Sequence, residues 1–297
     1  MNRAALVAAA GETIARGSRS FAMASRLFDG PTRARAWLLY AWCRHCDDVM
    51  DGQALGGEMM VVEDPAAALA SIRDGTARAL AGEVMGQPPF DGLGIVAAEC
   101  AIPRRYIDDH LDGFALDADG WQPRTEADLI RYCYHVAGSV GCMMAIIMGV
   151  AADDEDTLGR ASDLGIAFQL ANIARDLAED DLAGRNYLPH EWLAELDVPP
   201  GEALKPHFRK RLAVAARWLG ELAAEREASA RIGAARLPFR ARWAVLAAAG
   251  IYGNIVREVV RRGDRAWDER VVVSGREKVG FVGRALREAR AVAPAGK

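Results

Sequence analysis

The stretch PTRARAWLLYAWCRHCDDVMD, residues 31–51, decides the fold class. It begins with a proline, which suits the first turn of a helix, and then continues for about 20 residues without a helix breaker. Apolar side chains such as Trp37 and Leu38 occupy several of its faces, and charged residues gather toward its end. A long helix that is mostly buried is therefore predicted over this range.

Helical spacing continues through the rest of the chain, and proline and glycine separate the segments. Helices are predicted over 1–17, 65–81, 103–114, 125–150, 157–181, 201–230, 238–262 and 274–291. Only VVV at 271–273 is typical of a strand, and it is too short to found a sheet. Because no repeat or long linker interrupts the pattern, we predict an all-α fold that forms a single domain over residues 1–297.

The composition is that of a soluble globular protein, with 51% hydrophobic and 26% charged residues. A net charge of -4 argues against nucleic acid as a partner, because a phosphate backbone requires a basic surface. Five scattered cysteines and no export signal indicate reduced thiols and a cytoplasmic location. These features predict a soluble cytoplasmic protein.

Two stretches carry no charged residue, namely 136–152 and 243–256. A membrane-spanning helix needs about 20 apolar residues, so both stretches fall short and are predicted to be buried core helices. The first contains Gly138, Gly141 and Gly149, which would allow a neighbouring helix or a ligand to approach closely.

A first cluster of polar residues lies at the end of the opening helix. Tyr40, Arg44, Asp47, Asp48 and Asp51 share one face, because residues three and four apart are neighbours on a helix. Two close carboxylates repel each other unless one is protonated or a cation lies between them. Mg²⁺ prefers such oxygen ligands, but a solvated helix face is the better explanation for one isolated cluster.

The cysteines in the same segment suggest a different metal, and we weigh that alternative next. Cys43 and Cys46 have CxxC spacing, but no second pair follows at the spacing of a zinc site, and His45 lies between them. A redox motif would need a strand leading into it, whereas this pair lies deep in a helix. We therefore expect no zinc and no redox chemistry at these thiols, and expect Cys43 to pack as a small apolar residue.

A second polar cluster matches the first. In FQLANIARDLAEDDLAGRNYLP, residues 168–189, the side chains of Gln169, Asn172, Asp176 and Asp180 align on one helix face. Burying these groups together is costly unless they serve one another or an ion. Two such ladders on facing helices would hold several Mg²⁺ ions with a diphosphate between them, and the ions would help that diphosphate to leave.

Two further motifs are expected to carry no function. DDHLDG at 108–113 has similar acidic spacing, but it has no amide ligand, and Arg104 and Arg105 can pair with it at the surface. GLGIVA at 92–97 resembles a dinucleotide fingerprint, but no strand precedes it.

Together these segments resemble a known family. YAWCRHCDDVMDG at 40–52 and the stretch 168–189 closely resemble the two signature segments of squalene and phytoene synthases. RYCYHVAGSVG at 131–141 and GSRSFAMAS at 17–25 are similar to two more family segments. The resemblance covers roughly residues 12–280, and the segments look most like those of bacterial phytoene synthases.

The resemblance implies an all-α isoprenoid-synthase bundle around a central apolar cavity. It implies Mg²⁺, with Mn²⁺ as a substitute, bound by Asp47, Asp51, Asn172, Asp176 and Asp180. It implies contacts to the diphosphate or the prenyl chain from Ser18, Ser20, Tyr40, Arg44, Gln169, Tyr252 and Arg270. Relatives often have glutamate at the position of Asp48, which leaves open whether Asp48 is a ligand or only adjacent to one. The uncharged stretches would supply the cavity wall, with Met143, Met144, Met148 and Tyr252 as candidates.

The family reaction joins two geranylgeranyl diphosphates head to head and gives phytoene through a cyclopropyl diphosphate. The family also contains enzymes that join two farnesyl diphosphates to dehydrosqualene or squalene, and these share the same motifs. No dinucleotide motif stands out, so no nicotinamide cofactor is expected. Because the substrate is lipid-like, peripheral contact with a membrane is expected.

Other functions fit the sequence less well. Chain elongases and terpene cyclases also use aspartate-rich helices, but the serine motif and the GRNYLP tail fit them poorly. A non-catalytic assembly factor of the same fold would not need to keep both ladders.

Overall fold

The computed structural model describes residues 1–52, 62–199 and 201–291, and every regular element in these ranges is a helix. The all-α prediction is confirmed. The single domain predicted over 1–297 extends over residues 53–61, 200 and 292–297, which lie outside the described residues. The helices are α1 (Arg3–Gly17), α2 (Arg19–Ser25), α3 (Gly30–Met50), α4 (Pro65–Leu80), α5 (Pro88–Cys100), α6 (Arg104–Ala118), α7 (Glu126–Cys133), α8 (Ser139–Ile147), α9 (Glu155–Leu182), α10 (His190–Glu195), α11 (Arg209–Ala234), α12 (Phe239–Arg262) and α13 (Gly275–Ala291).

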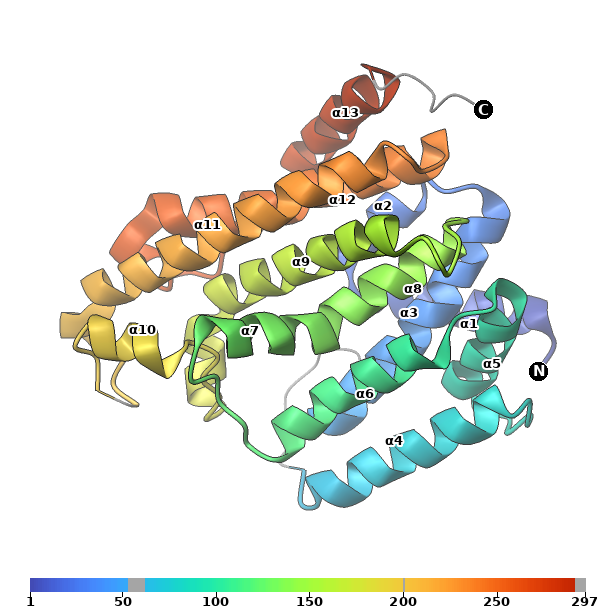
Figure 1. Cartoon of the computed structure of the whole chain (residues 1–297), viewed down its shortest axis with the longest axis horizontal. Helices are drawn as coiled ribbons and strands as arrows, with labels where there is room; N and C mark the ends of the chain where they lie inside the picture. The colour runs from blue at the N-terminus through green and yellow to red at the C-terminus, as the bar shows by residue number, and fades with distance from the viewer. Residues whose placement is uncertain (53–61, 200, 292–297) are drawn as a thin grey trace.

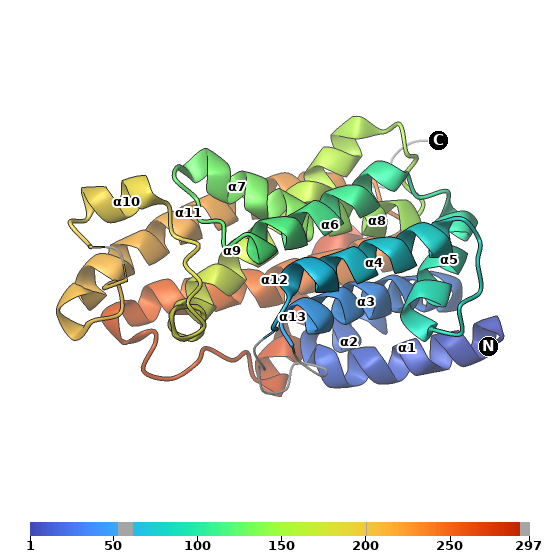
Figure 2. The ribbon, with the colours of Figure 1, turned by 90° about the horizontal axis from the view of Figure 1, so that it is seen from below.

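The long helix α9 is at the centre of the bundle (Figure 1). It packs against α8 on one side and against α11 and α12 on the other. Helix α3 packs on α1 and α5, α4 lies against α5 and α6 at one edge, and α13 lies along α12 at the opposite edge (Figures 1 and 2). Two large apolar clusters fill the layers, one around α9 and α11 and the other around α3, α5 and α8.

Local sequence explains where the predicted helices begin. The Asp29 side chain accepts a hydrogen bond from the backbone N–H of Thr32, and Pro31 occupies the first turn of α3. Asp154 caps α9 through Thr157, and Asp64 caps α4 through Ala67. The helices predicted over 31–51, 65–81, 157–181, 238–262 and 274–291 are present, with ends that differ by only a few residues.

Several segments differ from prediction, among them the short helices α2 and α10, which were not predicted. The helix expected over 201–230 begins only at Arg209, because Pro206 opens a separate 3₁₀ turn just before it. The helix expected over 125–150 contains a π-helical turn at Tyr134–Gly138, and α8 ends at Ile147. Helix α5 was not predicted, because Pro88 and Pro89 indicate a break, yet they form its first turn.

The uncharged stretches overlap two helical runs, Glu126–Ile147 and Phe239–Arg265, that have the length and composition of membrane spans. About half of each apolar window is buried in the protein, 50% and 56% respectively, as in core helices of soluble proteins. Gly141 permits the expected close approach, because a Cβ there would lie 2.3 Å from the Ala161 carbonyl oxygen. The prediction for Gly149 is wrong, since it faces open space and its φ of 98° serves the turn after α8.

Candidate active site

One cavity of about 940 Å³ runs through the bundle and is lined from α2, α3, α6, α8, α9, α11 and α12 and from the segment after α12. Each predicted site residue contributes to its wall: Ser18, Ser20, Tyr40, Arg44, Asp47, Asp51, Gln169, Asn172, Asp176, Asp180, Tyr252 and Arg270. Residues more than 200 positions apart in the sequence therefore share one space.

The first ladder lies at the carboxyl end of α3. Asp47 and Asp51 are one turn apart, and the Asp51 backbone N–H donates to the Asp47 carbonyl oxygen at 2.9 Å. The Asp47 side chain exposes 47% of its surface into the cavity, where Arg44 forms an ion pair with it at 3.0 Å. Burial and the Asp51 charge together raise the pKa of Asp47 to about 7, against the attraction of Arg44. Removing these carboxylates from bulk water is thus unfavourable in the absence of a further cation.

Asp48 has a different orientation from Asp47. Its carboxylate accepts a hydrogen bond from Arg44 at 2.5 Å, only 14% of its side chain is exposed, and it is not part of the cavity wall. Asp48 is therefore adjacent to the ladder and fixes the guanidinium of Arg44.

The second ladder lies on α9 and points into the same cavity. Gln169, Asn172, Asp176 and Asp180 occupy successive turns of one helix face. Arg270 donates to Asp176 at 2.8 and 3.0 Å, so the segment after α12 is tied to this ladder. Burial, followed by the Asp176 charge, raises the pKa of Asp180 to about 7.

A second arginine also contacts Asp176. Arg175 forms a two-point ion pair with this carboxylate and lines the cavity beside it. Asp176 is thus held between Arg175 and Arg270, two guanidinium groups that reach it from different parts of the chain.

Residues that were not predicted as part of the site connect the two ladders. Arg185, which follows α9, donates to Asp51 of α3 at 2.5 Å. Asp117 of α6 accepts hydrogen bonds from the hydroxyls of Tyr132 and Tyr187, both at 3.1 Å. Burial raises the pKa of Asp117 to about 6, although Arg185 favours its carboxylate form. All four groups line the cavity.

Part of this bridging group lies in segments that the sequence singles out. Tyr132 lies within RYCYHVAGSVG, and Arg185 and Tyr187 lie within GRNYLP, although their contacts carry no signal in the sequence. Asp117 lies in ALDADG, beyond the end of the helix predicted over 103–114. Its side chain reaches the site because α6 extends to Ala118, four residues beyond the predicted end.

The donor set fits Mg²⁺. Both ladders offer carboxylate and amide oxygens, and the carboxylates with raised pKa values would gain from a nearby cation. Among the described residues, no three aspartate, glutamate, histidine or cysteine side chains are close enough to enclose a metal by themselves. That arrangement suits an ion that binds one or two carboxylates and completes its shell with water and substrate phosphates.

Away from the ladders most of the cavity wall is apolar, although His110, Thr157 and Arg160 also line it. Away from the ladders its wall includes Phe21, Phe28, Leu39, Phe114, Val136, Val140, Met144, Met148, Leu164, Phe168 and Val245. Tyr252 stacks on Phe168 with ring centroids 4.1 Å apart. Met144, Met148 and Tyr252 line the wall as predicted. The prediction for Met143 is wrong, because its side chain points into the core and is 0% exposed.

The thiols in α3 are surrounded by protein. Burial raises the pKa of Cys43 and of Cys46 above the usual range, so neither favours the thiolate that metal binding or redox work requires. Cys46 is 0% exposed, and Cys43 packs against the apolar cluster of α3 while also touching the cavity.

Comparison with known proteins places this arrangement in a family. Residues 14–277 match the family model for squalene/phytoene synthase. The chain is 45% identical over 281 residues to a 15-cis-phytoene synthase of Pantoea ananas, covering 94% of this chain and 90% of the relative. It is 42% identical over 283 residues to a 15-cis-phytoene synthase of Paracoccus sp., with coverage of 94% and 90%.

A solved structure agrees with this result. A dehydrosqualene synthase crystallised with a ligand superposes with a TM-score of 0.86 at 26% identity, covering 97% of this chain and 98% of the other. The match therefore extends over the bundle and both ladders. This chain belongs to the squalene/phytoene synthase family.

Proposed function

We propose that this chain is a Mg²⁺-dependent prenyltransferase that condenses two geranylgeranyl diphosphates head to head into 15-cis-phytoene, releasing diphosphate. The observation that carries the proposal is that both oxygen ladders and a long apolar wall share one cavity of about 940 Å³. Relatives at 42–45% identity over most of the chain are phytoene synthases, which supports this product.

Asp47 and Asp51 from α3, together with Asn172, Asp176 and Asp180 from α9, would hold the Mg²⁺ ions, and Mn²⁺ offers a similar shell. Bound there, the ions would neutralise the diphosphate and so help it to leave. The two helices are already fixed relative to each other by the contact of Arg185 with Asp51.

The cationic side chains of the cavity would bind the diphosphates. Arg44 and Arg270 reach the cavity from opposite ladders, and each already holds a carboxylate. A diphosphate would compete for these guanidinium groups, which suit bidentate contact with phosphate oxygens. Ser20 would donate its hydroxyl to a phosphate oxygen, while Ser18 also caps α2 by accepting from the Phe21 N–H at 3.3 Å.

The apolar wall would protect the reaction from water. Departure of the first diphosphate leaves an allylic cation, which the double bond of the second substrate attacks. Loss of a proton from the resulting cation closes the cyclopropane ring of prephytoene diphosphate. Ionisation of that intermediate, rearrangement and loss of a proton give phytoene. Tyr40, Tyr252 and Gln169 line the route between the ladders and the wall, where they would position the prenyl chains.

No reductant is needed for this product, so we assign no nicotinamide cofactor. We place the enzyme in the cytoplasm with peripheral contact to a membrane, because a twenty-carbon prenyl substrate and a forty-carbon hydrocarbon product both partition into lipid.

The test is product analysis with purified protein. Geranylgeranyl diphosphate and Mg²⁺ should give diphosphate and a forty-carbon hydrocarbon with the absorption spectrum and retention of phytoene, and chelation of the metal should stop both. If no hydrocarbon forms from any prenyl diphosphate, the proposal that this chain is a prenyltransferase is refuted.

A second candidate is the thirty-carbon reaction, which the similarity to a dehydrosqualene synthase favours. Competition between farnesyl and geranylgeranyl diphosphates in one reaction decides between them. A higher kcat/KM for farnesyl diphosphate, with a thirty-carbon product, would select the second candidate.

A further inference from the structure

Helix α13 carries an unusual charge for this chain. Gly275–Ala291 contains five cations and two acids, which gives +3 in a protein whose net charge is -4. The side of α13 that faces the bundle is apolar and carries Phe281, Ala285 and Ala289. Three of the five cations, Arg276, Arg287 and Arg290, lie on the side that faces away from the bundle, whereas Lys278 lines the cavity.

Spacing places the arginines on one stripe. Arg276, Arg287 and Arg290 are exposed, and their intervals of eleven and three residues return to the same side of a helix. No ion pair involving these three is recorded among the described residues, whereas many surface arginines elsewhere have a carboxylate partner. This stripe is hereafter the basic face of α13.

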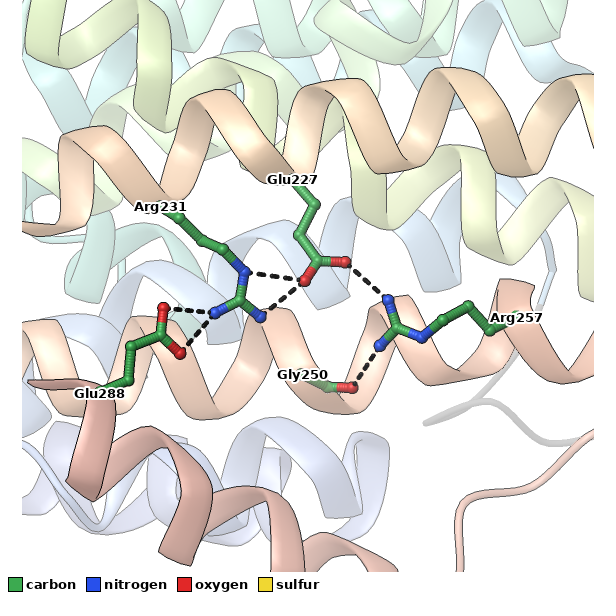
Figure 3. Close-up of polar contacts among 5 residues, drawn as sticks. All are labelled: Glu227, Arg231, Gly250, Arg257 and Glu288. Carbon is green, nitrogen blue, oxygen red and sulfur yellow. Dashed lines mark hydrogen bonds and ion pairs between the residues drawn. The ribbon is translucent and has the colours of Figure 1, made fainter.

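The two acids of α13 are turned away from this face. Glu277 caps the helix by accepting from the backbone N–H of Ser274 at 2.8 Å. Glu288 points inward and forms an ion pair with Arg231 of α11 at 2.6 Å (Figure 3). Arg231 also holds Glu227, which in turn binds Arg257 of α12 at 3.1 Å.

These inward contacts fix the orientation of the helix. The indole of Trp243 donates to the Val282 carbonyl oxygen at 2.9 Å, and Phe281 fits against Gly250, where a Cβ would lie 2.9 Å from its ring. With its apolar side and Glu288 committed to α11 and α12, α13 can only present its arginines outward.

The basic face begins beside the opening of the cavity. Val271, Val272, Val273 and Lys278 line the cavity, yet Val272 is 72% exposed, so the cavity meets solvent at this segment. Val279, one turn into α13, is 65% exposed. Exposed valines thus lie next to a row of arginines, and arginines near a membrane surface are attracted by anionic lipid headgroups.

We propose that the basic face of α13, with Val272 and Val279, docks on the surface of an anionic lipid bilayer and so turns the cavity opening toward the membrane. The inference rests on the proposed function for its purpose, since a prenyl diphosphate would then pass between bilayer and cavity. The docking itself depends only on charge and exposed apolar groups, because anionic headgroups attract arginines near the surface.

Vesicle flotation tests the docking without any substrate. The protein should float with vesicles of equal parts phosphatidylglycerol and phosphatidylcholine, float far less with phosphatidylcholine alone, and detach as salt is raised. The triple variant R276Q/R287Q/R290Q should lower the partition coefficient by roughly tenfold or more.

A matched triple variant controls for net charge. R124Q/K210Q/R217Q also removes three exposed cations. They lie just before α7 and in the first half of α11, at the α10 end of the bundle and away from α13 (Figure 1). This triple should change the partition coefficient by less than about twofold. Circular dichroism and thermal unfolding verify that both triples fold. If the α13 triple is unstable, the three single variants should each lower partition by roughly threefold.

Equal flotation of the α13 triple and the original chain would overturn the proposal, as would equal losses in both triples or equal binding to neutral vesicles. Turnover provides a separate readout. The α13 triple should keep its kcat with substrate dispersed in detergent and lose rate only with substrate supplied in anionic vesicles. Failure of the proposed reaction would abolish turnover in both formats but leave the flotation result intact.

Discussion

Three acidic stretches of similar spacing have different surroundings in this protein. Asp47 and Asp51 on α3 face the cavity, and so do Asp176 and Asp180 on α9. The aspartates of the run at 108–112 on α6 lie outside the cavity wall, where Asp108 pairs with Arg104 at 3.1 Å and Asp112 with Arg73 at 2.7 Å.

The three stretches differ in whether their acids face the cavity and in which groups pair with those acids. Arg104 pairs as predicted, but Arg105 does not, since it donates to the Tyr106 hydroxyl at 3.0 Å. Asp109 accepts from the hydroxyl of Tyr134 at 2.5 Å. Each acid of the run thus has a partner at its own edge. The ladder aspartates lie together in one confined space, where the pKa values of Asp47 and Asp180 are raised although arginines lie nearby, and a further cation or a proton would relieve their repulsion.

The largest expected effect separates the ladders from the run on α6. Asp47→Ala or Asp176→Ala should lower kcat by at least about a thousandfold, because each removes a carboxylate that would hold the metal. Phytoene formation under saturating substrate and Mg²⁺ measures this, and circular dichroism should show unchanged helix content.

The matched controls are Asp108→Ala and Asp112→Ala. Each removes one partner of a surface ion pair, so turnover should remain within about twofold of the original. An active Asp176→Ala enzyme, or an inactive Asp112→Ala enzyme that is folded, would contradict this contrast.

A smaller effect is expected at the one acid of α6 that does face the cavity. Asp117→Asn keeps the size of the side chain but removes the charge beside Arg185, and kcat should fall by about ten- to a hundredfold. Steady-state kinetics with geranylgeranyl diphosphate provide the measurement.

Two tyrosine variants show how Asp117 acts. Tyr132→Phe and Tyr187→Phe each remove one hydrogen bond to Asp117 and leave its charge. If the charge beside Arg185 matters most, each should cost less than Asp117→Asn. Full activity in Asp117→Asn would exclude any role for this carboxylate.

The contrast among these acids also shows what the sequence could predict. The ladders are local features, because residues three and four apart share a face of any helix, and helices α3 and α9 follow from caps and unbroken apolar spacing. Both are present as expected, and both face the same cavity.

The contacts between helices could not be read in this way. Asp117 meets Tyr187 only because the segment after α9 reaches the end of α6, and Arg185 reaches Asp51 across 134 positions of sequence. Met143 and Met144 are adjacent, yet only Met144 lines the cavity, and the choice depends on how the π-helical turn at Tyr134–Gly138 rotates α8. Such details are set by packing and have no periodic signal.

A third prediction concerns pH and the metal. The pKa of Asp180 is about 7 in the folded protein and 3.8 as its ordinary value, so the folded state binds more protons between these values. Metal-free stability should therefore fall as pH rises from about 4 to about 7, and Asp180→Asn removes this loss. The free energy of unfolding of Asp180→Asn minus that of the original protein should increase by on the order of 1–2 kcal/mol from pH 5 to pH 8.

Urea unfolding at the two pH values measures this change. Mg²⁺ should stabilise the original protein more at pH 8, where the carboxylates are ionised, than at pH 5. Asp112→Asn, at an exposed ion pair, is the control and should show little pH-dependent change. A constant difference between Asp180→Asn and the original would mean that Asp180 titrates normally.

The smallest effect on turnover is expected at the thiols that precede the ladder residues of α3. Cys43→Ser together with Cys46→Ser should retain turnover within about two- to threefold, because neither thiol favours the thiolate form. The folded state should nevertheless lose about 1–3 kcal/mol, since Cys46 is 0% exposed and a serine hydroxyl there lacks water.

Activity per folded molecule and urea unfolding distinguish these two consequences. The corresponding double alanine variant provides the control, because it introduces no buried hydroxyl and should restore part of the lost stability while keeping turnover. If both double variants fold and both lose activity, the thiols would take part in the reaction. The carboxylates one turn away would then no longer account for the chemistry of α3 alone.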